Sequence, residues 1–158
     1  MASPEDVAAL TALLGRAPQA DFDVVVHSAT GAPVVIRNVP FTADGTPMPT
    51  RYWLVDPVLH AAVSRLEAAG GVRAAQAAVD PGALAAAHDR YRAERDAAID
   101  PAHRGPRPSA GVGGTRRGVK CLHAHYAWFL AGGDDPVGSW VEHELHAAAT
   151  AAAREAGA

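Results

Sequence analysis

The segment Cys121-Leu-His123-Ala-His125 carries a thiol and two imidazoles within five residues. All three side chains are metal-ligand types, and zinc accepts cysteine together with histidine. On a strand the three side chains would share one face. On a helix, Cys121 and His125 are i, i+4 neighbours, whereas His123 points to roughly the opposite side. The surrounding sequence favours a helix, so we expect at most two of the three in one site.

A zinc site at this segment needs further ligands from elsewhere in the chain, and Asp56 is the carboxylate that we consider for this role. The alternative is a structural role for the same residues, which is the more common case. Free cysteine is among the most buried residue types, and Cys121 then acts as a small buried hydrophobe. The two histidines are hydrogen-bonded helix residues in that interpretation.

Cys121 and His123 are also candidate catalytic residues of a thiol centre. A cysteine near a helix N-terminus, beside Lys120 and two imidazoles, has its thiolate favoured. Cysteine–histidine pairs serve nucleophilic catalysis in many enzymes. The single cysteine of the chain leaves no Cys-x-x-Cys motif and no resolving partner.

A glycine-rich basic segment precedes the cysteine and indicates anion binding. Such loops hold phosphate through backbone N–H groups and the dipole of the helix that follows. The segment is not a Walker loop, because Val119 stands where that motif requires lysine. A flexible glycine loop without a ligand is the alternative. The candidate residues for binding a phosphorylated small molecule are Arg51, Gly113, Gly114, Arg116, Arg117 and Lys120.

Cap residues and hydrophobic patterns predict the elements that must position these side chains. Serine or aspartate followed by proline, at Ser3 and Asp56, is typical of a helix start. Two β-branched runs around Thr30-Gly31 predict an antiparallel hairpin. We therefore expect an α+β fold, in which a small antiparallel sheet packs against several helices. The predicted helices are 4–14, 57–67, 80–99, 119–130 and 136–156, the strands are 23–27, 33–37 and 51–55, and 100–118 is a long loop.

Length and composition limit the classes of protein. A chain of 158 residues fits one domain, and alanine supplies much of its 49% hydrophobic content, which predicts thin helices around a modest core. A net charge of −3 gives no reason to expect nucleic acid as a partner. The lone cysteine excludes an internal disulfide. Acidic residues near the N-terminus and the lack of a long apolar run predict a cytoplasmic protein without membrane insertion.

Two long motifs carry a resemblance to a known family. The segments MPTRYWLVDPVLHAAVSRLEAAGGV (48–72) and GVGGTRRGVKCLHAHYAWFLA (111–131) resemble the uncharacterised, mainly actinobacterial domain of unknown function 501 (DUF501). The resemblance covers about residues 22–140 and implies no activity. Genes of the family often lie near those of a septum-formation initiator protein, enolase and an exopolyphosphatase. This context implies a link to septum-formation proteins.

The resemblance also bears on the metal site. Many members carry cysteines at the positions of Ser28 and Asp56 besides the one at Cys121, and three cysteines with His123 imply a metal or iron–sulfur site. Some members lack His125, so the resemblance favours Cys121 and His123 as the pair. Serine is a poor ligand at position 28, which argues against an iron–sulfur cluster here, whereas Asp56 can ligate zinc through oxygen.

Three functions remain open on the sequence. The first is metal binding, with zinc as the cofactor, at Cys121, His123 or His125, and Asp56. The second is an enzyme or binder of a phosphorylated small molecule. The third is a non-catalytic adaptor linked to cell division or envelope growth, which predicts a filled environment around Cys121 and an exposed apolar patch elsewhere.

Overall fold

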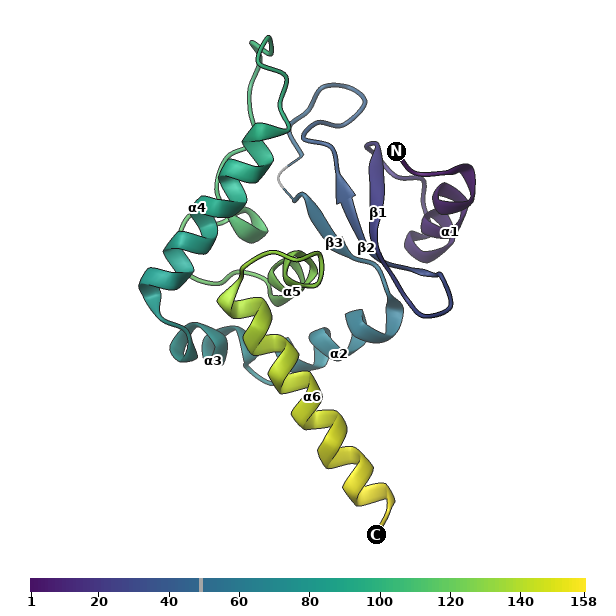
Figure 1. The fold of residues 1–158 in the computed structure, drawn as a ribbon, viewed down its shortest axis with the longest axis vertical. Helices are drawn as coiled ribbons and strands as arrows, with labels where there is room; N and C mark the ends of the chain where they lie inside the picture. The colour runs from purple at the N-terminus through teal and green to yellow at the C-terminus, as the bar shows by residue number, and fades with distance from the viewer. Residues whose placement is uncertain (49) are drawn as a thin grey trace.

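The computed structural model describes residues 1–48 and 50–158, in which six α-helices surround a three-stranded antiparallel sheet (Figure 1). The predicted α+β fold is confirmed. In chain order the elements are α1 (Pro4–Leu14), β1 (Phe22–His27), β2 (Pro33–Asn38), β3 (Tyr52–Leu54), α2 (Pro57–Ala68), α3 (Gly71–Ala78), α4 (Pro81–Ala97), the 3-10 turn η1 (Val112–Gly114), α5 (Leu122–Leu130) and α6 (Pro136–Ala156).

The sheet has the order β1-β2-β3 and separates two hydrophobic clusters. Because successive side chains of a strand point to opposite faces, Tyr52 and Leu54 of β3 enter one cluster and Trp53 packs against the other. Val35 and Leu54, which pair across β2 and β3, belong to the larger cluster that contains α5. Ile36 lies on the other face with Leu10 of α1. The sheet therefore has α1 on one face and α5 on the other.

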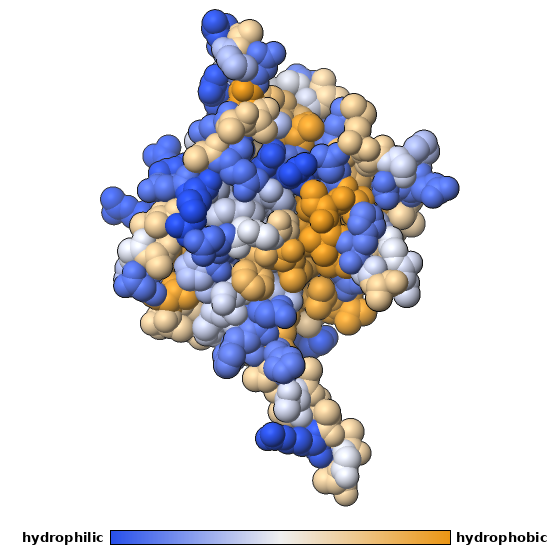
Figure 2. All heavy atoms as spheres, viewed as in Figure 1, coloured by the Kyte–Doolittle hydropathy of each residue, from blue (hydrophilic) through white to orange (hydrophobic). Residues whose placement is uncertain are grey.

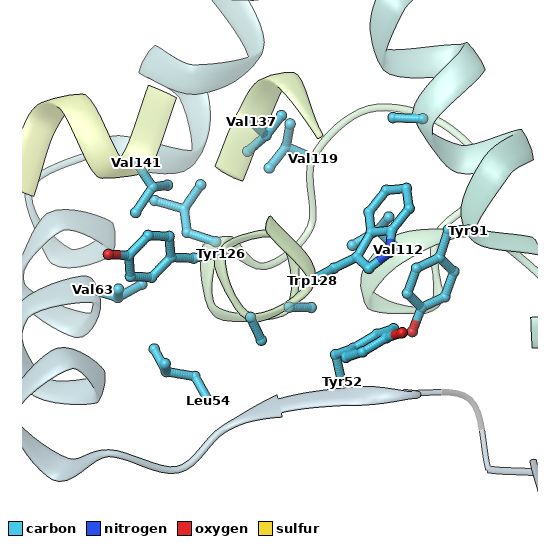
Figure 3. Packing of buried hydrophobic residues seen from close by; sticks show 14 of the residues in the cluster. Tyr52, Leu54, Val63, Tyr91, Val112, Val119, Tyr126, Trp128, Val137 and Val141 are labelled. Atoms are coloured by element: carbon cyan, nitrogen blue, oxygen red, sulfur yellow. The ribbon is translucent and has the colours of Figure 1, made fainter. Parts of the chain in front are cut away.

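Helix α5 is the centre of the larger cluster. Its aromatic side chains extend to two sides, as Figure 3 shows. Trp128 packs edge-on against Tyr91 of α4, with ring centroids 5.3 Å apart, and Tyr126 lies on the side of α2 and α6. A helix that is apolar on nearly all sides is buried, and this burial fixes the position of α5 against the sheet. The buried residues of α5 are Leu122, Ala124, His125, Tyr126, Ala127 and Trp128.

The helix predicted over 119–130 begins later, at Leu122. Cys121 is its N-cap residue, with an extended backbone at φ −145° and ψ 119°. The cysteine therefore precedes the helix instead of lying within its first turns.

The structure also contains a helix that the pattern did not predict, α3. Gly70, with φ +89°, turns the chain after α2, and α3 starts at the next residue. The alanine-rich sequence of α3 favours a helix, and the buried Ala75 packs it against the larger cluster, although no side chain caps it.

The outer surface differs strongly between elements. On the face drawn in Figure 2, hydrophobic side chains gather over the sheet and hydrophilic side chains cover α4. The C-terminal half of α6 projects away from the body of the molecule (Figure 1), and residues 146–156 are all exposed. Among the described residues, no helix combines the length and hydropathy that crossing a bilayer requires.

Candidate metal centre

Glu67, Cys121 and His123 bring three possible metal-ligand atoms within 4.8 Å of one another. Cys121 precedes α5, His123 lies in the first turn of α5, and Glu67 lies in the last turn of α2. The Nδ1 atom of His123 is 3.2 Å from Glu67 Oε1 and 3.9 Å from Cys121 Sγ. A carboxylate, a thiol and an imidazole nitrogen thus converge where α2 meets the start of α5.

Glu67 reaches this point because it caps α5. Its Oε1 atom accepts a hydrogen bond of 2.7 Å from the backbone N–H of Leu122. The first N–H groups of a helix have no partner within the helix, and Cys121 offers no side-chain cap of its own. A carboxylate at this position also interacts favourably with the helix dipole. The capping contact therefore holds the carboxylate of Glu67 beside the thiol and the imidazole.

The second ring nitrogen of His123 is held from the opposite side. Nε2 lies 3.2 Å from the carbonyl oxygen of His60 and 3.1 Å from Ser64 Oγ. Because a carbonyl oxygen only accepts, the contact to His60 places a proton on Nε2. The Nδ1 atom then faces Glu67 and Cys121. Histidines that bind metals commonly donate their other N–H to a carbonyl or a carboxylate in this way.

The surroundings of His123 favour a positive charge at Nδ1. Its hydrogen bond to Cys121 raises the pKa of the imidazole, burial acts against this, and the charge of Glu67 raises the pKa further. The net result is a pKa above the ordinary value for histidine. A carboxylate that faces Nδ1 is stable when a proton or a metal cation lies between them.

A pocket of about 500 Å³ adjoins Cys121 and His123. Cys121 and His123 form part of its wall, and the strand β3 forms another part through Tyr52, Trp53 and Leu54. Largely apolar pockets with a few polar groups are the usual form of small-molecule sites. The adaptor hypothesis predicts a filled environment around Cys121. In the structure, Cys121 lines a pocket instead.

The family model described as "Protein of unknown function (DUF501)" matches residues 24–143. The chain belongs to the DUF501 family. No curated protein and no solved structure matches the chain. The DUF501 match includes Glu67, Cys121 and His123, whereas α1 lies outside it.

His125 lies apart from this cluster of the DUF501 chain. Its side chain is fully buried, and Nδ1 is 2.6 Å from Asp135 Oδ2. The other oxygen of Asp135 caps α6 by accepting from the N–H groups of Val137 and Gly138. The i, i+4 relation expected between Cys121 and His125 does not hold, because Cys121 is outside the helix. His125 instead joins α5 to the start of α6.

Asp56 is also outside the cluster that the described residues form. It is the N-cap of α2, and its Oδ1 atom accepts a 2.8 Å hydrogen bond from Leu59 N–H. The carboxylate that joins Cys121 and His123 is Glu67, near the other end of the same helix. Sequence reasoning missed Glu67 because no local spacing links it to residues more than 50 positions away.

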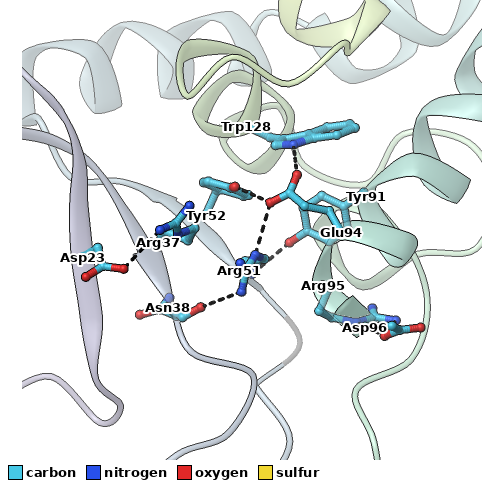
Figure 4. A network of polar contacts seen from close by, with 10 residues as sticks. All are labelled: Asp23, Arg37, Asn38, Arg51, Tyr52, Tyr91, Glu94, Arg95, Asp96 and Trp128. Atoms are coloured by element: carbon cyan, nitrogen blue, oxygen red, sulfur yellow. Dashed lines mark hydrogen bonds and ion pairs between the residues drawn. The ribbon is translucent and has the colours of Figure 1, made fainter. Parts of the chain in front are cut away.

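Arg51 belongs to a different polar network (Figure 4). Its Nε atom is 3.2 Å from Glu94 Oε1, and the same carboxylate accepts hydrogen bonds from Tyr52 OH and Trp128 Nε1. Burial and the bond to Glu94 raise the pKa of Tyr52. Glu94 of α4 therefore joins the start of β3 to α5. Arg51 belongs to this junction and does not lie beside Arg116 or Arg117 in a common pocket.

The glycine segment is divided between two pockets. Gly113 and Gly114 form η1 with φ values of +65° and +76°, and Gly113 lines the pocket beside Cys121. Arg116 and Arg117 line a second pocket of about 450 Å³. The side chain of Lys120 is exposed and lines neither pocket. The predicted anion-binding set is therefore split by the fold, and of its four cationic residues only Arg116 and Arg117 line a common pocket.

Proposed function

We propose that this DUF501 protein binds a zinc ion through Glu67, Cys121 and His123, next to a pocket that accepts a small molecule. The observation that carries the proposal is the convergence of a thiol and a carboxylate on one nitrogen of His123. Tetrahedral zinc, with Zn–N and Zn–O near 2.0 Å and Zn–S near 2.3 Å, needs ligand atoms about 3.3 Å (N to O) and about 3.6 Å (N to S) apart. The corresponding distances are 3.2 Å and 3.9 Å, and all three ligand atoms lie within 4.8 Å of one another.

The same three residue types could instead form a catalytic triad, but their arrangement disfavours it. A cysteine nucleophile and an orienting carboxylate must contact different nitrogens of the histidine, so that a proton moves through the ring. Here Cys121 and Glu67 both face Nδ1, and Nε2 of His123 is occupied by protein contacts. This geometry supports ligation of one cation, and it places no carboxylate on the opposite ring nitrogen, where a triad requires it.

The number of ligands supports a site that is open to a substrate. Structural zinc sites have four protein ligands, whereas catalytic sites have three and keep one position for water or substrate. Cys121 and His123 line the pocket, so a molecule bound there lies next to the ion. A zinc ion in such a position polarises a carbonyl or lowers the pKa of a bound water.

The test is elemental analysis of protein purified without a polyhistidine tag. We expect about one zinc per chain in the unaltered protein and none in Cys121→Ser or His123→Ala. Cobalt substitution adds a direct readout of the thiolate, because cobalt–sulfur charge-transfer absorption requires Cys121 as a ligand.

Glu67→Gln is the most informative variant. Its amide oxygen can still accept from Leu122 N–H and preserve the cap, while the negative charge of the ligand is lost. We expect zinc affinity to fall about tenfold to 100-fold in a folded protein. His143→Ala, at an exposed histidine on α6, is the matched control for His123→Ala and should keep full zinc affinity. Folded unaltered protein without zinc affinity, or full affinity in all three site variants, would contradict the proposal.

A further inference from the structure

A second pocket lies between α3, α4 and the segment that carries Arg116 and Arg117. Its volume is about 450 Å³. Leu84 and Ala85 of α4 supply an apolar part of the wall, and Gln76 of α3 supplies a polar part. The pocket thus combines two cationic side chains with apolar surface, and it shares no lining residue with the pocket beside Cys121.

The segment with the two arginines is fixed in place, although its glycines predicted a flexible loop. His88 uses both ring nitrogens to hold it, since Nδ1 accepts from Val112 N–H at 3.1 Å and Nε2 donates to Gly118 O at 2.9 Å. Gln76 Oε1 accepts from Val119 N–H at 2.9 Å. These bonds anchor residues on both sides of the arginines, which reduces the entropy that a ligand must overcome when it binds.

Glycine is required where the segment passes His88. A Cβ atom on Gly111 would lie 2.4 Å from His88 Nδ1. The backbone can approach the imidazole this closely only because residue 111 is glycine. The sequence of the segment thus allows His88 to anchor it.

The charges of Arg116 and Arg117 are not balanced by the protein. Within residues 1–48 and 50–158, neither guanidinium takes part in an ion pair or donates a hydrogen bond. By contrast, Arg51 and Arg95 contact carboxylates. Two guanidiniums in the wall of one pocket match a dianion better than a monoanion, and their planar forks fit the oxygens of a phosphate.

We propose that Arg116 and Arg117 bind the phosphate of a phosphomonoester whose apolar or aromatic part lies against Leu84 and Ala85. Gln76 uses its Oε1 atom for Val119, which leaves its amide nitrogen as a further donor in the pocket wall. This site is separate from the zinc site and does not depend on it.

Calorimetric titration with phenyl phosphate tests the proposal, with inorganic phosphate and benzoate as comparison ligands. We expect one phenyl phosphate per chain, bound about tenfold more tightly than either comparison ligand, because only it satisfies both parts of the pocket. The titration uses protein treated with a chelator, and it is repeated on Cys121→Ser, so that binding to zinc cannot account for the signal.

Two variants locate the binding site. The double variant Arg116→Gln/Arg117→Gln should weaken phenyl phosphate binding about tenfold or more, whereas Arg107→Gln, an exposed arginine of the same loop, should leave it unchanged. Ala85→Glu places a carboxylate in the pocket on an exposed helix position and should also abolish binding. Ala83→Glu adds the same charge to α4, about 200° around the helix, and serves as its control.

The proposal is overturned if phenyl phosphate does not bind, or if benzoate binds equally well. It is also overturned if the double variant and Ala85→Glu retain full affinity. None of these outcomes depends on zinc content. The phosphate site and the zinc site are therefore tested independently of each other.

Discussion

Helix α5 carries two histidines in opposite surroundings, His123 in its first turn and His125 near its middle. His123 is partly exposed, lies beside Glu67 and Cys121, and borders a pocket. His125, two residues later, is fully buried and bonded to a buried aspartate, Asp135. One imidazole is open to a ligand, and the other is part of the packing between two helices.

The start of the helix explains the difference. Because α5 begins after Cys121, the cysteine side chain and His123 both lie near the free N–H groups that attract Glu67. By the position of His125 the helix has entered the core, where an imidazole needs a partner of its own. Closeness in sequence therefore does not make the two histidines part of one site.

The largest loss of stability is expected from breaking the buried pair of His125 and Asp135. His125→Ala leaves the carboxylate of Asp135 buried without its imidazole partner, and we expect a loss of about 3 kcal/mol in the free energy of unfolding. Urea denaturation measures it. Zinc content of the folded protein should stay at one per chain. A loss below about 1 kcal/mol would show that the pair is not a structural contact.

At His123, we expect zinc binding to change the free energy of unfolding. At a zinc concentration 100 times the dissociation constant, binding adds about 2.7 kcal/mol to the stability of the unaltered protein. His123→Ala should lose this response completely and cost only about 1 kcal/mol without metal, because the ring is only partly buried. Urea denaturation with zinc and with a chelator gives both numbers. An equal gain in stability with zinc in the variant would show that His123 is not a ligand.

A third histidine, His88, sharpens the contrast through pH. It packs edge-on against His125, with ring centroids 5.7 Å apart. Burial lowers its pKa, the hydrogen bond to Gly118 O acts in the opposite direction, and the charge of His125 lowers the pKa further. The neutral ring is also the form that accepts from Val112 N–H while it donates to Gly118 O.

A pKa that is lower in the folded state means that the unfolded chain binds more protons. The contribution of His88 to stability is therefore complete above the unfolded pKa, near 6.5, and is lost as the pH falls below it through the folded pKa. Stability should fall by up to about 1.4 kcal/mol per pH unit from this group. Urea denaturation from about pH 7.5 to about pH 5.5 should give a smaller slope for His88→Gln. Equal slopes would contradict the assignment.

The smallest effect concerns Asp56, the carboxylate that the sequence suggested as a ligand. Asparagine is as good an N-cap as aspartate, so Asp56→Asn should change stability by less than about 0.5 kcal/mol. Zinc affinity should be unchanged, in contrast to Glu67→Gln. A marked loss of zinc from Asp56→Asn, measured by elemental analysis, would mean that this carboxylate joins the site.

The sequence predicts most of the fold because its signals are local. Ser3-Pro4 and Asp56-Pro57 do begin helices, and the β-branched runs at 23–27 and 33–37 do pair as a hairpin. Helix α3 escaped prediction because neither a capping side chain nor large apolar residues mark it.

The arrangement of the candidate site needed information that is not local. The choice of Glu67 over Asp56 depends on how α2 packs against α5, which no spacing in the chain records. The separation of Arg51 from Arg116 and Arg117 follows from the position of Glu94 on α4. Cys121 and His123 were identified from residue type, whereas their partner follows from tertiary packing.

The carboxylate of Glu94 has a consequence for how the molecule folds and opens. It accepts from Arg51, Tyr52 and Trp128, at sequence separations of 43, 42 and 34 residues. Bonds of this span form only after long loops close, so the junction is expected to form late in folding. Once formed, it releases three donors together if α4 detaches. Opening of α4 should therefore be a cooperative sub-global event, visible in hydrogen exchange as equal protection of α4 and β3.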